Sequence, residues 1–288
     1  MSGIKRIGVV GAGMMGSEIA LVFALAGCEV LLADKGAEAL ERARAKLSAI
    51  LDKGVAKGAY DAAAAAETLQ RLTFTEDLAR FSDRELVIEA VFEDEGVKAE
   101  IYRALDPVLP ADCLIASNTS SISISALASH WSEARRPNFM GLHFFSPVSR
   151  MKLVEAISGF DTDPKALARA QAACEAAGKA AVPVKDVTGF AVNRLLMAFF
   201  IEANKLVEEG VATPEDIDTA CRLGLGHPVG PFKLLDEVSN PLALQVMEIL
   251  HEAYGERFHP PPLMKQMVQS GRYGRKAGRG WYDYREER

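Results

Sequence analysis

Cysteine is scarce in this sequence of 288 residues, and its spacing argues against a cysteine-rich metal site. The four cysteines are widely scattered, at Cys28, Cys113, Cys174 and Cys221. No C-x-x-C pair occurs, so we expect no metal. Each cysteine lies in an apolar or helical context, which favours a small buried side chain. Free thiols of this kind suit a reducing compartment.

Long apolar runs and an excess of positive charge are also lacking. No stretch of about 18 apolar residues occurs, which predicts no transmembrane helix and no membrane partner. No signal-type apolar run precedes the first predicted strand, so we expect a cytoplasmic protein. The net charge of −6 argues against nucleic acid as a partner, because such binding needs clustered cationic surface.

The remaining composition is typical of a globular protein with two domains. At about 150 residues per domain, the length is sufficient for two hydrophobic cores. In the first half, short β-rich runs alternate with helical stretches, which predicts an α/β fold with a parallel sheet. The predicted strands are residues 7–10, 30–33, 86–90, 114–117 and 139–145.

Two segments depart from this alternation. Residues 36–72 are rich in Ala, Glu, Arg and Lys and are too long for one crossover helix, so we expect a helical hairpin. A domain boundary falls near residues 179–189, beyond which strand signals are scarce. The sequence therefore predicts a Rossmann-like domain over 1–185 and an all-α domain for substrate binding and dimerisation over 186–288.

The second predicted domain begins with a long helix that is unusually apolar. Residues 195–201 are apolar without interruption, so the helix needs cover on every side. Because about 100 residues make only a thin core, we expect a twofold partner to cover the helix, with Phe200 facing outward. A monomer whose later helices wrap this helix remains the alternative. Gly210 is expected to end the helix, and Thr213 to cap the next one.

A glycine-rich motif follows the first predicted strand. Residues 11–16 read GAGMMG and open a helix that is expected to stop at Gly27. Gly11 allows a tight turn, Gly13 lets the backbone approach a pyrophosphate, and Gly16 lets the helix pack on the strand. The helix N-terminus supplies N–H donors to the phosphate. This pattern predicts a dinucleotide site.

An acidic residue closes the second predicted strand. Asp34 lies 23 residues after Gly11, where a carboxylate accepts hydrogen bonds from the ribose hydroxyls of the adenosine. A 2′-phosphate there would meet negative charge. We therefore predict NAD rather than NADP as the cofactor.

Polar residues near the ends of later strands are candidates for catalysis. The segment 117–121, SNTSS, follows a predicted strand and is expected to point into the ligand crevice, although it can also cap a helix. His143 ends a strand among bulky apolar residues, a setting that also suits a structural histidine. Glu155 lies in an otherwise apolar run and needs a buried partner. A pair of His143 and Glu155 would be a general base with a fixed tautomer.

Taken together, these residues resemble the 3-hydroxyacyl-CoA dehydrogenase family over nearly the whole chain. The resemblance implies a Rossmann-like fold with a helical second domain, NAD as cofactor, and a homodimer formed through that second domain. The matching stretches are GAGMMG at 11–16, SNTSS at 117–121, GLHFFSPV at 141–148, MKLVEAI at 151–157, DVTGFAVNRLL at 186–196, PEDIDTA at 214–220, GHPVGPFKLLD at 226–236 and GRGWYDY at 278–284.

The resemblance also implies roles for individual residues. His143 would be the catalytic base and Glu155 its partner, while Ser120 and Asn193 would hold the substrate oxygen. Lys53, in the helical insertion, matches a position that touches coenzyme A. The residues that match cofactor contacts are Gly11, Gly13, Met14, Met15, Gly16, Asp34, Glu93, Lys98, Ser120, Ser146 and Lys276.

Some positions depart from the family pattern. Ser146 and Asp94 stand where many members carry Asn, and the spacing from Ser120 to His143 is slightly longer than in some members. The first two departures are expected to tune nicotinamide binding. None of them removes a proposed catalytic group.

The resulting hypothesis is NAD-dependent oxidation of a 3-hydroxyacyl-CoA thioester to the 3-oxoacyl-CoA, and its reverse, as in fatty acid β-oxidation. One alternative keeps the fold and takes a free 3-hydroxy acid as substrate. A second alternative is a structural or sensory protein that binds NAD without catalysis. The insertion with its lysines favours the thioester, and the set of Ser120, His143, Glu155 and Asn193 favours catalysis.

Overall fold

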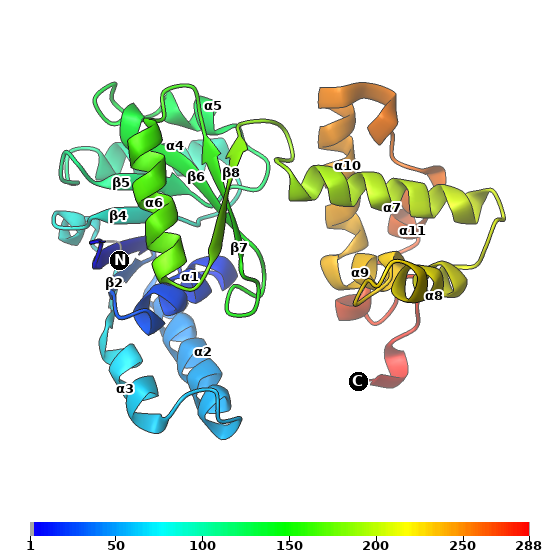
Figure 1. The fold of residues 1–288 in the computed structure, drawn as a ribbon, viewed down its shortest axis with the longest axis horizontal. Helices are drawn as coiled ribbons and strands as arrows, with labels where there is room; N and C mark the ends of the chain where they lie inside the picture. The colour runs from blue at the N-terminus through cyan, green and yellow to red at the C-terminus, as the bar shows by residue number, and fades with distance from the viewer. Residues whose placement is uncertain (1–2, 288) are drawn as a thin grey trace. The chain divides into compact units, whose positions relative to one another are not determined.

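The computed structural model describes residues 3–287 and has two compact units, Met1–Val187 and Thr188–Arg288 (Figure 1). The first unit is a layered α/β structure around one sheet, and the second is helical. The predicted fold class is confirmed. None of the helices within the described residues is long and apolar enough to cross a membrane.

Eight strands within the described residues form the sheet, in the order β3-β2-β1-β4-β5-β6-β7-β8. All neighbouring strands run parallel except β6 and β7, which are antiparallel. The central strands are buried on both faces, which is why they appear in the sequence as continuous apolar runs. The strands are β1 (Arg6–Val10), β2 (Glu29–Ala33), β3 (Leu72–Thr75), β4 (Leu86–Glu89), β5 (Leu114–Ser117), β6 (Phe139–Phe144), β7 (Leu153–Ser158) and β8 (Ala180–Lys185).

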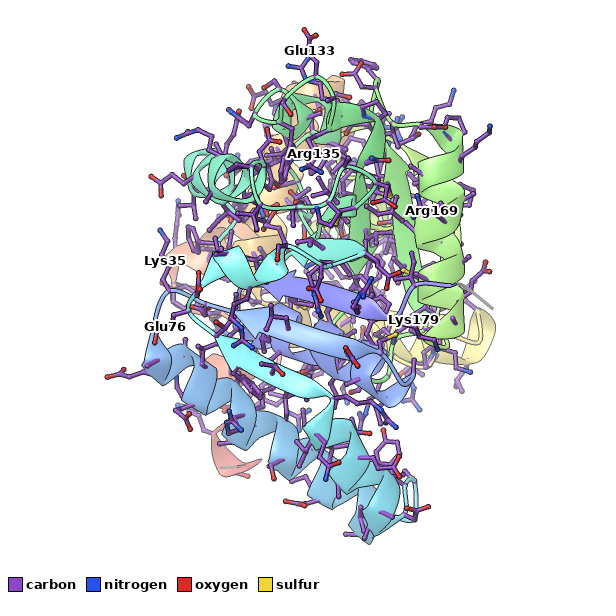
Figure 2. The ribbon with its side chains drawn as sticks, turned by 90° about the vertical axis from the view of Figure 1, so that its left-hand side faces the viewer. Lys35, Glu76, Glu133, Arg135, Arg169 and Lys179 are labelled. Atoms are coloured by element: carbon purple, nitrogen blue, oxygen red, sulfur yellow. The ribbon has the colours of Figure 1, made fainter. Side chains whose placement is uncertain are left out.

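Helices connect the strands of the first unit. Helix α1 packs against β1 and β2 and is buried from Gly16 to Ala24, whereas α6 packs against β7 and β8. Figure 2 shows Lys35 and Glu76, which follow the parallel strands β2 and β3, at the same end of these strands. The helices are α1 (Met14–Leu25), α2 (Ala37–Ala56), α3 (Ala62–Gln70), η1 (Leu78–Phe81), α4 (Glu95–Leu105), α5 (Ile124–Ala128), η2 (Arg136–Asn138) and α6 (Pro164–Ala176).

The predicted helical insertion consists of α2 and α3, which contact each other. Gly54 lies inside α2, and the turn is at Gly58, whose φ of +69° suits glycine. Asp61 then caps α3 by accepting a hydrogen bond from the Ala64 N–H at 2.6 Å. The prediction of two helices is confirmed.

The second unit contains five α-helices within the described residues. Gly210 follows α7 with φ of +69°, and the Thr213 hydroxyl accepts a hydrogen bond from the Asp216 N–H, as the sequence predicts. The helices are α7 (Val192–Glu208), α8 (Pro214–Gly224), α9 (Pro231–Val238), α10 (Asn240–Tyr254), η3 (Gly255–Phe258), α11 (Pro262–Gln269), η4 (Arg275–Ala277) and η5 (Arg285–Glu287).

The structure contradicts the outward position that the sequence predicts for Phe200 on α7. Phe200 is fully buried and belongs to the core of its own unit, together with Phe232 and Leu235, so it does not face outward. Leu195 is 73% exposed, so its own unit leaves one side of α7 uncovered, as the sequence predicts. The apolar run cannot distinguish side chains that the unit itself covers from those that it leaves exposed.

A buried carboxylate holds the C-terminal segment of the second unit. Asp236 is 2% exposed and accepts hydrogen bonds from the N–H groups of Trp281 and Tyr282 and from the Tyr284 hydroxyl, at 2.9 to 3.1 Å. Burial raises the pKa of Asp236, although these donors oppose the effect. Gly280 packs so closely that a Cβ would lie 1.9 Å from an Asp236 oxygen. The segment from Gly280 to Tyr284 is therefore anchored to the core of this unit.

Candidate active site

The glycine motif forms a tight turn between β1 and α1. Gly11 has φ of +103°, and a Cβ added there would lie 2.5 Å from the Ala90 carbonyl oxygen. A Cβ at Gly16 would lie 1.9 Å from the Gly11 oxygen, so both positions require glycine. A Cβ at Gly13 would instead meet no atom within 4 Å. The turn thus leaves open space at the N-terminus of α1, where a pyrophosphate fits.

Asp34 lies beside this turn, at the end of β2. Its Oδ2 accepts a hydrogen bond from the Ala12 N–H at 2.7 Å, which ties the carboxylate to the glycine loop. A cavity of about 430 Å³ is lined by Asp34, Gly13 and the cations Arg42 and Lys46 of α2. The sequence reasoning did not single out these two cations, although their spacing of four residues places them on one helix face.

The order of the strands indicates where the two ends of a dinucleotide lie. With the pyrophosphate at the end of β1 and the adenosine ribose at Asp34 beside β2, the nicotinamide end extends in the opposite direction. That direction leads over the ends of β4 and β5. The residues at those strand ends, and on β6 beyond them, are therefore candidates for the chemistry.

His143 and Glu155 are directly opposite each other on the antiparallel strands β6 and β7. His143 Nδ1 lies 2.8 Å from Glu155 Oε2, and the two side chains are 6% and 1% exposed. On the other side of the ring, Nε2 lies 3.1 Å from the Ser120 hydroxyl. A carboxylate only accepts hydrogen bonds, so Nδ1 carries a proton, and in the neutral imidazole Nε2 then offers a lone pair. This arrangement can accept a proton from a hydroxyl bound beside Ser120.

Glu93 holds the segment that carries Ser120. Its Oε1 accepts hydrogen bonds from the Thr119 hydroxyl at 2.6 Å and from the N–H groups of Ser120 and Ser121 at 2.8 and 3.0 Å. Burial raises the pKa of Glu93, but the Lys98 ammonium and these donors outweigh that effect and lower it. The carboxylate is therefore charged at neutral pH and fixes the loop after β5.

Lys98 links Glu93 to a second carboxylate. Its Nζ lies 2.7 Å from Glu89 Oε1 and 3.3 Å from Glu93 Oε2, and the lysine side chain is 1% exposed. Sequence reasoning missed Glu89, which is fully buried at the end of β4. The sequence does contain an indication of its role, because Glu89 is the only charged residue in the apolar run 86–89, LVIE.

Other residues predicted to bind ligands have different surroundings. Ser146 is exposed, and its hydroxyl lies 3.9 Å from the Met14 sulfur. Asp94 caps α4 by accepting a hydrogen bond from the Val97 N–H at 2.9 Å, a role that asparagine can also fill. The remaining residues are Met15, half-buried in α1; Lys53, exposed in the last turn of α2; Asn193, half-buried at the start of α7; and Lys276, exposed in η4.

The structure brings together only part of the predicted site. Ser120, His143 and Glu155 form one hydrogen-bonded chain in the first unit, and Glu93 and Lys98 adjoin it through the Ser120 segment. The glycine motif and Asp34 lie at neighbouring strand ends. Asn193 and Lys276 belong to the second unit.

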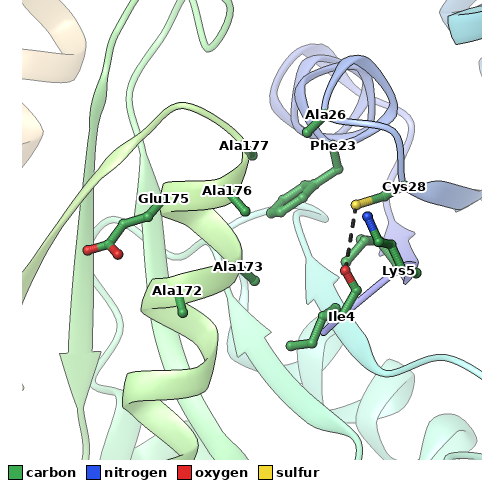
Figure 3. Close-up of a pocket in the computed structure, with 11 residues that line it drawn as sticks. Ile4, Lys5, Phe23, Ala26, Cys28, Ala172, Ala173, Glu175, Ala176 and Ala177 are labelled. Atoms are coloured by element: carbon green, nitrogen blue, oxygen red, sulfur yellow. Dashed lines mark hydrogen bonds between the residues drawn. The ribbon is translucent and has the colours of Figure 1, made fainter. Parts of the chain in front are cut away.

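A further cavity lies at the opposite end of β1 (Figure 3). It has a volume of about 460 Å³ and is lined largely by apolar side chains, including Phe23 and Ile4. Cys28 also lines it, with Sγ 3.9 Å from the Ile4 carbonyl oxygen. Burial raises the pKa of the Cys28 thiol, which keeps it protonated and unreactive. Lys5 and Glu175 also line this cavity, which lies at the end of β1 away from the glycine turn.

Comparison with known proteins matches both units. Residues 6–187 match the NAD binding domain of 3-hydroxyacyl-CoA dehydrogenase, and residues 189–284 match the C-terminal domain of the same family. These two matches cover nearly the whole chain and confirm the resemblance, including NAD as the cofactor.

Individual relatives are similar over their full length. A 3-hydroxybutyryl-CoA dehydrogenase of Mycobacterium tuberculosis is 43% identical over 284 residues, which cover 98% of this chain and 99% of the relative. One from Bradyrhizobium diazoefficiens is 40% identical over 283 residues, with coverage of 98% and 96%.

A solved structure extends the comparison to three dimensions. The (S)-3-hydroxybutyryl-CoA dehydrogenase of Ralstonia eutropha superimposes with a TM-score of 0.93 at 38% identity, covering 98% of this chain and 99% of that one. The fold of this relative, the two family matches and the glycine turn all indicate the same family. The chain belongs to the 3-hydroxyacyl-CoA dehydrogenase family and is an NAD-dependent oxidoreductase.

Proposed function

We propose that the protein oxidises (S)-3-hydroxyacyl-CoA to 3-oxoacyl-CoA with NAD, and catalyses the reverse reduction. The observation that carries this proposal is the chain from Ser120 through His143 to Glu155. This chain lies at the strand ends toward which a bound nicotinamide would extend. Its middle member, His143, would present the Nε2 lone pair there. The relatives named as 3-hydroxybutyryl-CoA dehydrogenases support a CoA thioester as the substrate.

In the proposed mechanism, the substrate hydroxyl binds beside Ser120 and gives its proton to His143 Nε2. NAD, when bound, accepts the hydride that leaves C3. The O–H and C–H bonds break as the C=O bond forms, so the products are a ketone, NADH and an imidazolium. Glu155 stabilises this imidazolium, and proton transfer of this type contributes about 10²- to 10⁴-fold to the rate. Ser120 and Asn193 would hold the oxygen.

Coenzyme A is expected to contact cations of the helical insertion. Lys53 remains the predicted contact, and it is exposed in the last turn of α2. Arg42 and Lys46 lie nearer the glycine loop and line the cavity beside Asp34. Arg42 pairs with Glu38 and Lys46 with Glu18, so a phosphate-bearing ligand would compete with these carboxylates for the two cations.

We also propose a homodimer formed through the second unit, within a protein of the cytoplasm that serves fatty acid β-oxidation. Exposed apolar side chains on the second unit support such an interface, since contact would remove them from water. The most exposed are Leu195 at 73%, Val211 at 63%, Leu223 at 80% and Leu225 at 64%.

The substrate assignment is tested by following NADH formation with matched substrates. We expect turnover with 3-hydroxybutyryl-CoA, weaker turnover with the truncated pantetheine thioester, and little with free 3-hydroxybutyrate. Comparable kcat/KM for the free acid and the thioester would contradict the CoA assignment. No NADH from any of the three would contradict the proposed reaction itself.

A further inference from the structure

The carboxylate of Glu89 is fully buried and accepts four hydrogen bonds. Oε1 accepts from the Lys98 ammonium at 2.7 Å and from the Val91 N–H at 2.9 Å. Oε2 accepts from the hydroxyls of Tyr102 and Ser117, both at 2.8 Å. The Lys98 ammonium and the Val91 N–H can only donate, and the ion pair with Lys98 at 2.7 Å favours the charged carboxylate.

Glu89 belongs to a buried cluster with a net negative charge. Lys98 lies between Glu89 and Glu93, so two carboxylates share one ammonium. The neighbours Tyr102 and Ser117 are neutral, and burial together with the Glu89 charge raises the pKa of Tyr102 well above its usual value. The three charges therefore sum to −1. Glu89 and Lys98 are 0% and 1% exposed, so the fields of these two charges are weakly screened, whereas the Glu93 side chain is 36% exposed.

The cluster lies at the strand ends where the nicotinamide is expected. Glu89 is the last residue of β4, and its register partner is Ser117, the last residue of β5. The next residue, Ala90, contacts the glycine turn, and Glu93 holds the Ser120 segment. The negative charge is therefore placed between the dinucleotide turn and the catalytic histidine.

We propose that Glu89 biases the cofactor site toward the oxidised form of NAD. The nicotinamide ring of NAD⁺ carries a positive charge that NADH lacks, so a nearby negative charge stabilises the oxidised cofactor selectively. A purely structural role for Glu89 would weaken the binding of both forms alike. The ratio of the two affinities therefore separates an electrostatic role from a structural one.

The direct test is the variant Glu89→Gln, which keeps the shape. Its amide oxygen can accept from Lys98 and Val91, and its NH2 group would face the hydroxyls of Tyr102 and Ser117, which can turn to accept. Dissociation constants for NAD⁺ and NADH are measured by calorimetry and NADH fluorescence without substrate. We expect the ratio Kd(NAD⁺)/Kd(NADH) to rise about 3- to 20-fold, as one unit charge acting through a partly buried site would produce. Because no substrate is present, this result is independent of the proposed CoA chemistry.

Tyr102→Phe is the matched control, because it removes one hydrogen bond to the same carboxylate and leaves the charge unchanged. Its ratio should stay within about twofold of the parent. An unchanged ratio in folded Glu89→Gln, or an equal shift in Tyr102→Phe, would overturn the proposal. If Glu89→Gln does not fold, Glu93→Gln removes the other negative charge from a more exposed position. It should raise the ratio in the same direction, and failure to do so would also overturn the proposal.

Discussion

At the scale of single residues, chemistry depends on side chains held by neighbours rather than on one reactive group. Glu155 fixes the orientation of His143 from a site that is 1% exposed, so water does not compete for its carboxylate. Ser120 is fixed through its backbone N–H by Glu93. Ser120 and His143 are thus each oriented by an acidic residue.

Glu155→Gln tests the role of this partner. The amide keeps the size of the side chain but removes the charge that stabilises the imidazolium. We expect kcat for oxidation to fall by about 10- to 100-fold, and the acid limb of its pH profile to move to lower pH, because the imidazolium loses a stabilising anion. Steady-state rates across the pH range measure both effects. An unshifted profile with normal kcat would show that Glu155 has no role in the chemistry.

Asp34→Asn tests the choice of cofactor at the other end of the dinucleotide. Asparagine keeps an oxygen that can accept the Ala12 N–H, so the glycine loop remains supported while the negative charge is lost. The parent should prefer NAD over NADP in kcat/KM, and the variant should narrow that preference by about 10-fold or more. Equal kcat/KM for the two cofactors in the parent would count against this interpretation of Asp34.

At the scale of elements, strand ends and helix caps determine where the polar groups lie. Glu155 could be recognised from the sequence because it is an acid in an otherwise apolar run, and a buried carboxylate needs a partner. Glu89 follows the same rule, yet its partners come from β5 and α4, which only the fold brings together. Phe200 was assigned outward because an apolar run does not reveal which face the rest of its unit covers.

The C-terminal segment provides a test of stability at this scale. Asp236→Ala removes the acceptor of three donors from residues 281–284 and leaves them unpaired in a buried setting. We expect a loss of about 2–4 kcal/mol in the free energy of unfolding of this unit. The adjacent Glu237→Ala, whose side chain is 51% exposed and pairs with Arg275, should cost less than about 1 kcal/mol. Equal losses in denaturant titrations would contradict the role of Asp236.

At the scale of the whole molecule, the fold class, the dinucleotide turn and the family were all predictable from the sequence, because glycine spacing and strand patterns are local. The buried network of Glu89 was not, because it depends on contacts between distant segments. The proposed dimer is only partly predictable. Exposed apolar residues of the second unit support an interface but do not identify the surface that they would contact.

Leu223→Asp tests the proposed dimer. Leu223 is 80% exposed, so the substitution should leave each subunit folded while placing charge in an apolar interface. Light scattering at micromolar concentration should give twice the chain mass of 31.1 kDa for the parent and a lower mass for the variant. Phe200→Asp should instead unfold the second unit, because Phe200 is in its core. A parent that is monomeric at this concentration would contradict the dimer.

The central claim is that His143 is the base of an NAD-dependent dehydrogenase, and the single variant His143→Gln tests it most directly. NADH formation from 3-hydroxybutyryl-CoA is measured alongside the dissociation constant of NAD. We expect kcat to fall by about 10²-fold or more, the scale of a lost general base, while NAD binds within a few-fold of the parent because the glycine turn is untouched. Near-normal turnover in the variant would contradict the assignment.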